Sequence, residues 1–310
     1  MKFYHKLFLI LILGLTLTFI IGCATPAPTA TPTPEPTAAP TSTPTPPPAA
    51  MTEGSVLNDA LAKVKAATAY RVDMSITGKG NFASAGGPTP VAGAEDKPIT
   101  LVVMKGEVNG KDAHFTLQGI LTGFLGIEPE KTFEVISSNG DAYLKGPVPL
   151  LGATEEKWYK APANAASVAQ PPLTPGAFLN SFGETGINPN DFKMTGTESL
   201  DGQSCQVFAG DKSAVVNAFS KLGGATGATQ EDLDSIDNAE FKFWVCADGY
   251  LHQVKMLIEG HEKTKPDQKG SFEILMKITD FNTNISITPP ADAIPLKLPG
   301  PITPQASPTP

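Results

Sequence analysis

Apolar and polar residues along the chain follow two different periods. Between residues 56 and 67 the apolar positions return every three or four residues, which predicts an amphipathic helix. Ser55 is placed to cap this helix, and Asp59 lies in its first turn. From Tyr70 to Thr77 the apolar positions instead alternate with polar ones, so we expect a strand with one buried and one wet face.

Asparagine-glycine pairs predict that the following strands are joined as hairpins. A strand over residues 100–108 meets Asn109-Gly110 and continues into the alternating apolar positions Ala113, Phe115 and Leu117. A second hairpin is predicted over residues 133–144 around Asn139-Gly140. Hairpins in sequence produce an antiparallel sheet.

The middle of the chain is predicted to be helical. Thr174-Pro175 is suited to begin a helix that carries Phe178, Leu179 and Phe182 and ends at Gly183. A second helix is predicted over residues 211–222, and a short one near residues 229–236.

Strand patterns return at residues 203–208, 241–246, 250–258, 271–279 and 285–287. In Met256-Leu257-Ile258 and Ile274-Leu275-Met276 the apolar residues do not alternate, so we expect both faces of the sheet to be covered there. The fold class that follows is α+β. It consists of a strongly curved antiparallel sheet with helices that cover the concave face.

The two ends of the chain differ from this domain in composition. Residues 1–22 place basic residues before an apolar run that ends at Ile21, which is typical of an export signal. Residues 23–50 contain ten prolines and eight threonines and are expected to form a tether. Residues 51–291 are expected to form one domain, and residues 292–310 a proline-rich disordered tail.

Ile20-Ile21-Gly22-Cys23 resembles the lipobox of bacterial lipoproteins. The resemblance implies that Cys23 receives a diacylglyceryl group and becomes the first residue of the mature chain. We therefore expect an extracytoplasmic protein that is anchored to the cell membrane by N-terminal lipidation. The alternative is an uncleaved membrane anchor with a chance cysteine, although the apolar run is shorter than the roughly 20 residues that a span needs.

Charge excludes one class of partner. Without residues 1–22 the chain carries 21 basic and 31 acidic residues, a formal net charge of −10. Such a chain cannot neutralise a row of phosphates, so no nucleic-acid partner is expected. Contact with a membrane would have to come from the anchor or from apolar loops.

Two cysteines remain once Cys23 is lipidated. An even number in an oxidising compartment predicts a disulfide between Cys205 and Cys246. The alternative is a pair of buried thiols on neighbouring strands.

The residues that carry catalytic chemistry do not form a recognisable motif. His114, His252 and His261 are isolated, and neither a zinc-protease pattern nor a nucleophile elbow is present. We therefore expect no enzyme activity, no metal and no cofactor. An active site assembled from scattered residues remains the alternative.

Four segments carry a family resemblance: residues 61–76, the strand at 200–208, the hairpin at 243–252, and residues 278–282 leading to Pro289-Pro290-Ala291. Together they resemble the LolA/LolB-like superfamily, and within it the LppX and LprG type of lipid-binding lipoproteins. The resemblance spans roughly residues 52–291. It implies a half-open barrel with an apolar cavity for acyl chains, and a lipid or glycolipid as the ligand that is carried. The alternative role is a cell-surface interaction or envelope-sensing protein with the same fold, an envelope protein as partner and no lipid cargo.

Candidate ligand-binding residues follow from this expected cavity. The residues expected to line it are Val72, Met74, Val103, Phe115, Leu117, Phe178, Phe182 and Phe219. Two apolar, glycine-containing segments, 119–127 and 148–152, are expected to flank its mouth. The mouth residues are Leu121, Phe124, Leu125 and Leu150. These segments would equally suit loops tucked over the core.

Overall fold

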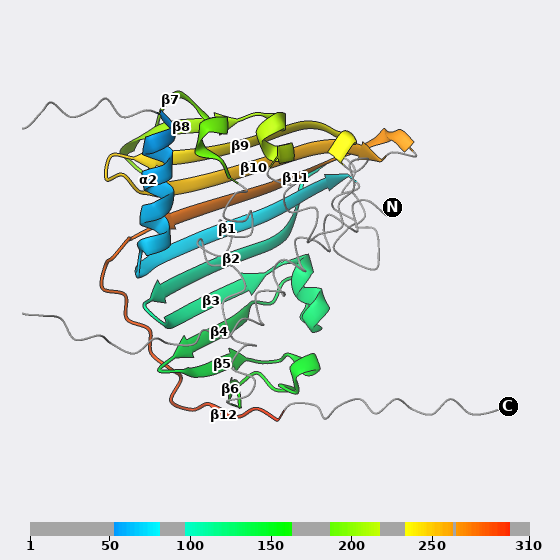
Figure 1. Cartoon of the computed structure of the whole chain (residues 1–310). Coiled ribbons are helices and arrows are strands. Elements are labelled where there is room, and N and C mark those ends of the chain that lie inside the picture. The colour runs from blue at the N-terminus through cyan, green and yellow to red at the C-terminus, as the bar shows by residue number, and fades with distance from the viewer. Residues whose placement is uncertain (1–52, 81–96, 163–186, 218–232, 263–264, 298–310) are drawn as a thin grey trace, which may run out of the picture.

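The computed structural model describes residues 53–80, 97–162, 187–217, 233–262 and 265–297. Their strands form one large curved sheet in the order β12-β6-β5-β4-β3-β2-β1-β11-β10-β9-β8-β7 (Figure 1). All neighbouring pairs are antiparallel except β12 and β6, which are parallel. The predicted α+β class with a curved, essentially antiparallel sheet is confirmed.

Each strand has the following bounds. They are β1 Ala69–Gly80, β2 Ile99–Asn109, β3 Asp112–Gln118, β4 Phe133–Ser138, β5 Asp141–Lys145, β6 Trp158–Lys160, β7 Lys193–Leu200, β8 Gln203–Gly210, β9 Ile236–Cys246, β10 Leu251–Glu262, β11 Lys265–Thr279 and β12 Ile294–Pro295.

Both predicted hairpins form, although the first turns at Gly110 and Lys111, one residue later than predicted. Asn139 and Gly140 both have positive φ, as the two central residues of a type I′ turn require, and they join β4 to β5. Asp201 and Gly202 do the same between β7 and β8. Local turn chemistry therefore fixes the register of these pairs.

Two expectations about the C-terminal end were wrong. Residues 285–287 do not form a strand; Ile285 is buried, and its carbonyl oxygen accepts a hydrogen bond from Asn109 Nδ2 at 2.7 Å. β12 lies in the segment that composition assigned to a disordered tail. There Leu296 is buried, and its N–H donates to the carbonyl oxygen of Lys160.

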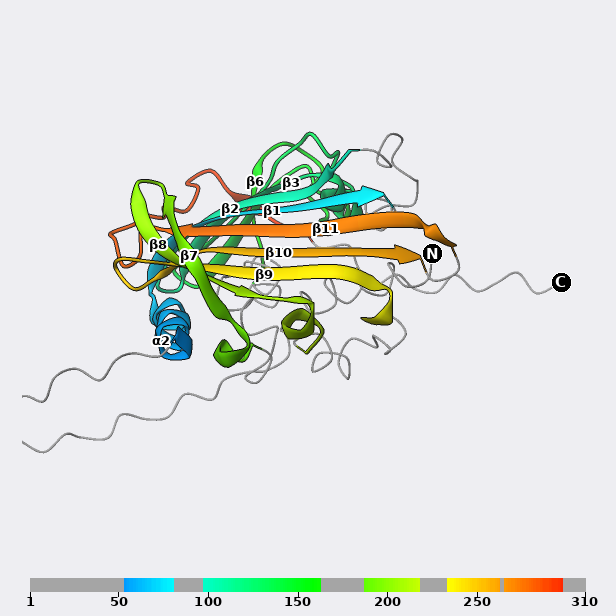
Figure 2. The same cartoon turned by 90° about the horizontal axis from the view of Figure 1, so that it is seen from above.

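Helix α2 (Glu53–Ala66) packs its apolar side against one face of the sheet, near β10 and β7 (Figures 1 and 2). Its buried side chains are Leu57, Ala60, Leu61 and Val64. The helix begins before Ser55, so this residue lies inside it rather than at the cap. Among the described residues, no helix is both long and apolar enough to cross a membrane.

The other described helices are short. They are the 3₁₀ helices η3 (Ile120–Leu125), η4 (Pro149–Leu151) and η6 (Pro189–Asp191). Residues 212–217 are helical, in agreement with the start of the helix predicted over 211–222. Residues 233–234 are also helical, but β9 already begins at Ile236. The helix predicted over 174–183 lies outside the described residues.

The two faces of the sheet differ in character. The face that packs with α2, called here the inner face, carries the buried side chains of Val72, Met74 and Ile76 from β1, whereas Arg71 and Asp73 point to the outer face. The outer face is only partly covered at the apolar triplets, whereas the prediction was cover on both faces. Leu275 is only half-buried opposite Lys255, and Leu257 is half-buried opposite Glu273.

Candidate functional site

An unbroken apolar row runs across the inner face from the edge strand β7 to β4. Each member lies directly opposite the next on the neighbouring strand, over nine strands from β7 to β4. In strand order the row is Met194, Phe208, Phe243, Val254, Met276, Met74, Met104, Leu117 and Phe133. Seven of the nine are buried; Leu117 is half-buried and Met194 is exposed.

Three consecutive methionines form the centre of this inner row. Met276, Met74 and Met104 are each at most 1% exposed. Methionine is unbranched and polarizable, so it adapts its shape to irregular apolar partners better than leucine or isoleucine does. Side chains of this kind contact hydrocarbon through dispersion and carry no directional polar group.

A second apolar row runs beside the first and contains a gap. It comprises Ile278, Val72, Gly106, Phe115, Val135, Leu144 and Tyr159. The gap is Gly106, and the ring of Phe115 fills it: a Cβ at Gly106 would lie 2.3 Å from Phe115 Cε1. The face therefore stays continuous where the side chain is missing.

An aromatic cluster surrounds the inner row at β9. The ring of Phe192, from the segment that leads into β7, meets Phe243 edge-on at 5.0 Å and Phe241 at 5.8 Å between centroids. Phe241 and Phe243 are themselves 4.6 Å apart. Sequence reasoning did not select these residues, although the alternation Phe241-Lys242-Phe243 carried the signal of a shared face.

The predicted lining residues divide into three groups. Val72, Met74 and Phe115 are buried on the inner face, and Leu117 is half-buried there. Val103 lies on the outer face, opposite Ser75 on β1 and Gln118 on β3, so it does not share a surface with the others. The remaining predicted lining residues, Phe178, Phe182 and Phe219, lie outside the described residues, as does the lipidation residue Cys23.

The two predicted mouth segments are brought together. Segment 119–127 forms η3 and segment 148–152 forms η4, and the two short helices contact each other. Leu121 and Leu125 pack against the core. Phe124 and Leu150 point outward, with 54% and 61% of their surface exposed. Whether these segments flank an opening stays a prediction.

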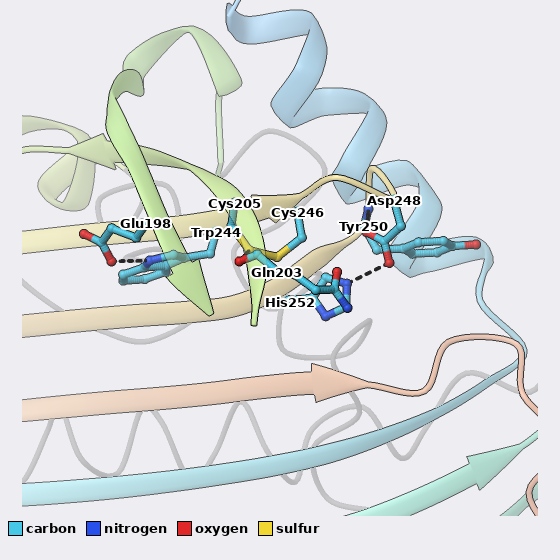
Figure 3. The surroundings of a disulfide bond; sticks show 8 residues. All are labelled: Glu198, Gln203, Cys205, Trp244, Cys246, Asp248, Tyr250 and His252. Carbon is cyan, nitrogen blue, oxygen red and sulfur yellow. Dashed lines mark hydrogen bonds and ion pairs between the residues drawn. A yellow bond between two sulfur atoms is a disulfide. The ribbon is translucent and has the colours of Figure 1, made fainter. Parts of the chain in front are cut away.

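The predicted disulfide is present. Cys205 and Cys246 lie directly opposite each other on β8 and β9 and are bonded (Figure 3). With Val207 and Trp244 they form a small apolar cluster of their own, separate from the inner rows. Trp244 Nε1 donates a hydrogen bond of 2.8 Å to Glu198 Oε2 on β7. This bond fastens the edge strand β7 to β9.

The three histidines each face one carboxylate rather than one another. His114 lies 2.9 Å from Glu134, His252 2.9 Å from Asp248, and His261 2.8 Å from Asp237. Within the described ranges, no group of three or more histidine, cysteine or acidic side chains is placed to hold a metal ion.

Only a few charged side chains show a clear electrostatic perturbation. Hydrogen bonds from Ser213 and from the backbone of Ala214 lower the pKa of Asp211 at the start of the 212–217 helix. On the outer face, hydrogen bonds to Asp280 and Glu107 raise the pKa of Arg71. Neither group lies on the two rows of the inner face.

No family model matches the chain, and no curated protein matches it. Among solved structures, the chain is similar to LprF from Mycobacterium bovis at 12% identity, covering 77% of this chain and 97% of that chain with a TM-score of 0.42. It is also similar to the lipoprotein LppX from Mycobacterium tuberculosis at 13% identity, covering 76% and 97% with a TM-score of 0.38.

A LolA superfamily protein from Nitrosomonas europaea is similar at 10% identity, covering 77% of this chain and 96% of that chain with a TM-score of 0.24. At such identities the likeness concerns the fold.

Proposed function

We propose that this chain is an extracytoplasmic lipoprotein, anchored through Cys23, that binds the acyl chains of a lipid or glycolipid along the inner face of its sheet and carries them. The observation that supports the proposal is the inner row. It offers a continuous apolar path across nine strands, with adaptable methionines at its centre and no charged side chain.

The energetics favour such a ligand. Burying hydrocarbon stabilises a complex by about 0.8 kcal/mol per methylene, so ten buried carbons contribute about 8 kcal/mol. Association costs about 4 kcal/mol or more, so longer or paired acyl chains are expected to bind more tightly than a single ten-carbon segment. The proposal therefore assigns the acyl chains, rather than a headgroup, as the part of the ligand that the inner face recognises.

Lipid content tests the proposal directly. The chain from residue 24 onward is exported to an oxidising compartment, purified, and examined by native mass spectrometry and lipid extraction. We expect bound lipid in the unmutated protein from more than one expression host. If no host yields bound lipid, the carrier role is wrong, and the envelope-sensing role without cargo takes its place.

A matched pair of variants locates the ligand. Leu117 belongs to the inner row, whereas Val103 lies one position out of phase on the paired strand and faces outward. Leu117→Trp adds bulk to the inner face and is expected to reduce bound lipid at least about twofold. Val103→Trp adds similar bulk outside and is expected to leave lipid unchanged. Equal losses in both variants, with both folded by circular dichroism, would place the ligand elsewhere.

A further inference from the structure

The two most exposed large apolar side chains of the described residues lie on two helices that touch. Of the four such side chains, Phe124 is on η3 and Leu150 is on η4, while Met194 and Ile294 are on the two edge strands. Single exposed apolar residues are normal on a protein surface, but two on contacting elements at one end of a sheet are not explained by packing. We call η3 and η4 the apolar tip.

The apolar tip is held firmly rather than left loose. Thr122 is buried, and its hydroxyl donates to the carbonyl oxygen of Gly119 at 2.7 Å. Gly126 and Gly152 end the two helices in the left-handed conformation. At the base of η4, Val148 and Ala153 pair as an isolated β-bridge. Side chains that stay exposed on such a fixed scaffold are positioned for a partner.

The charged side chains beside the apolar tip indicate which kind of surface it can bind. The backbone of Gly119 and the side chain of Gln118 bond to residues 129 and 130, and Gly146 bonds to residue 157, so the loops 128–131 and 155–157 flank the two helices. These loops carry four acidic and two basic side chains. Lys131 pairs with Glu128, and Lys157 pairs with Glu155. The two acidic side chains left over give the loops a net negative charge, which disfavours binding to an anionic lipid surface.

The expected tether lets the apolar tip reach the membrane. Figure 1 shows η3 and η4 at the end of the sheet away from α2, the helix that follows the expected tether in the sequence. The longest strand, β11, has 15 residues and spans roughly 50 Å. Residues 23–50 span up to about 85 Å when extended, which exceeds the length of the sheet.

We propose that the apolar tip docks on a membrane surface of neutral or zwitterionic lipid by inserting Phe124 and Leu150 at the headgroup level. This inference rests on the proposed function, for which the tip would bring the inner face to the bilayer that supplies or receives the lipid. Insertion depends on the two apolar side chains and not on charge attraction.

Vesicle flotation tests the inference with the unanchored chain from residue 24 onward. The protein is expected to float with phosphatidylcholine vesicles, with little dependence on salt. Phe124→Ser with Leu150→Ser is expected to lower the partition coefficient at least about tenfold. Ile294→Ser removes an exposed apolar side chain from edge strand β12, outside both the apolar tip and the inner row, and serves as the control, with unchanged partitioning. Replacing about 30% of the lipid by phosphatidylglycerol is expected to weaken binding at low salt.

Several outcomes would overturn the inference. Unchanged partitioning of the double variant would overturn it, as would binding that requires phosphatidylglycerol. A wild-type dimer in analytical ultracentrifugation that becomes monomeric in the double variant would assign the tip to a second copy of the chain. Lipid occupancy by native mass spectrometry separates the two proposals. A double variant that keeps its lipid but fails to float supports the tip, whereas a wild-type protein that floats without lipid contradicts only the carrier role.

Discussion

Phe115 lies directly opposite Gly106 on the neighbouring strand, and its ring occupies the space that a side chain at Gly106 would fill. Gly106→Ala would place a methyl group 2.3 Å from the ring, so Phe115 would have to leave its position in a close-packed face. We expect a loss of about 1–3 kcal/mol in the free energy of unfolding, measured by urea denaturation.

Gly123→Ala provides the control for this substitution. A methyl group added at Gly123 would meet no heavy atom within 4 Å, and the backbone there has no positive φ. The same chemical change is therefore expected to alter stability by less than about 0.5 kcal/mol. Equal stability of the two variants would show that Phe115 yields its position freely. Reduced lipid content in Gly106→Ala would in addition indicate that the contact between Phe115 and Gly106 supports lipid binding on the inner face.

Local signals in the sequence predicted the local structure well. The pair Asn139-Gly140 predicted the turn between β4 and β5, where both residues have the positive φ that such a turn requires. Edge strands were harder to predict. β7 reads Lys193 to Leu200 with mostly exposed side chains, and β12 has two residues, so neither shows an apolar alternation. Pairing with a neighbour, rather than burial, makes them strands.

The inner row was only partly predictable for a different reason. Strand periodicity assigned Met74 and Phe115 to buried positions, and both are buried. Periodicity within one strand does not reveal which distant strand lies beside it. Met74 meets Met276, about 200 residues away in sequence, through the pairing of β1 with β11. The placement of Val103 failed because a shift of one residue moves a side chain to the opposite face.

Reduction of the disulfide is expected to weaken the whole domain. Cys205 and Cys246 close a loop of 41 residues, which in the chain-entropy model stabilises the folded state by roughly 4 kcal/mol. Urea denaturation with and without reductant measures the difference. Cys205→Ser combined with Cys246→Ser should be less stable than wild type and unaffected by reductant. A wild-type protein that responds no more to reductant than this variant would indicate two free thiols in solution.

The contact between Trp244 and Glu198 is expected to hold β7 on the sheet. Trp244→Phe keeps an aromatic ring in the small outer cluster but removes the indole N–H that Glu198 accepts. We expect a loss of about 1 kcal/mol, because Glu198 is exposed and regains water as its partner.

A double-mutant cycle isolates this contact. Glu198→Ala and Trp244→Phe are measured singly and together by urea denaturation. The double variant is expected to be less destabilised than the sum of the single variants by about the energy of the hydrogen bond. Strict additivity would mean that β7 is held by its backbone pairing to β8 alone.

Acid is expected to remove the stabilisation that Asp211 provides as the cap of the 212–217 helix. Its carboxylate accepts hydrogen bonds from the backbone N–H groups of Ser213 and Ala214 at 2.9 and 3.3 Å, and from the Ser213 hydroxyl, at the start of the 212–217 helix. Hydrogen bonds from Ser213 and Ala214 lower its pKa below the ordinary 3.8. The unfolded chain therefore binds the proton more tightly, and the cap's contribution is complete above pH 3.8 and lost as the pH falls through the lowered folded pKa.

Two substitutions at this position separate charge from capping. Asp211→Ala removes both and is expected to cost about 1 kcal/mol at neutral pH. Asp211→Asn keeps a capping oxygen but has no carboxyl group to titrate, so its deficit relative to wild type should be constant near neutrality and shrink as the pH falls below 3.8. Urea denaturation of the three proteins between about pH 2.5 and 7 measures this. A deficit that grows in acid would mean that Asp211 is harder to ionise in the folded protein, contrary to the capping geometry.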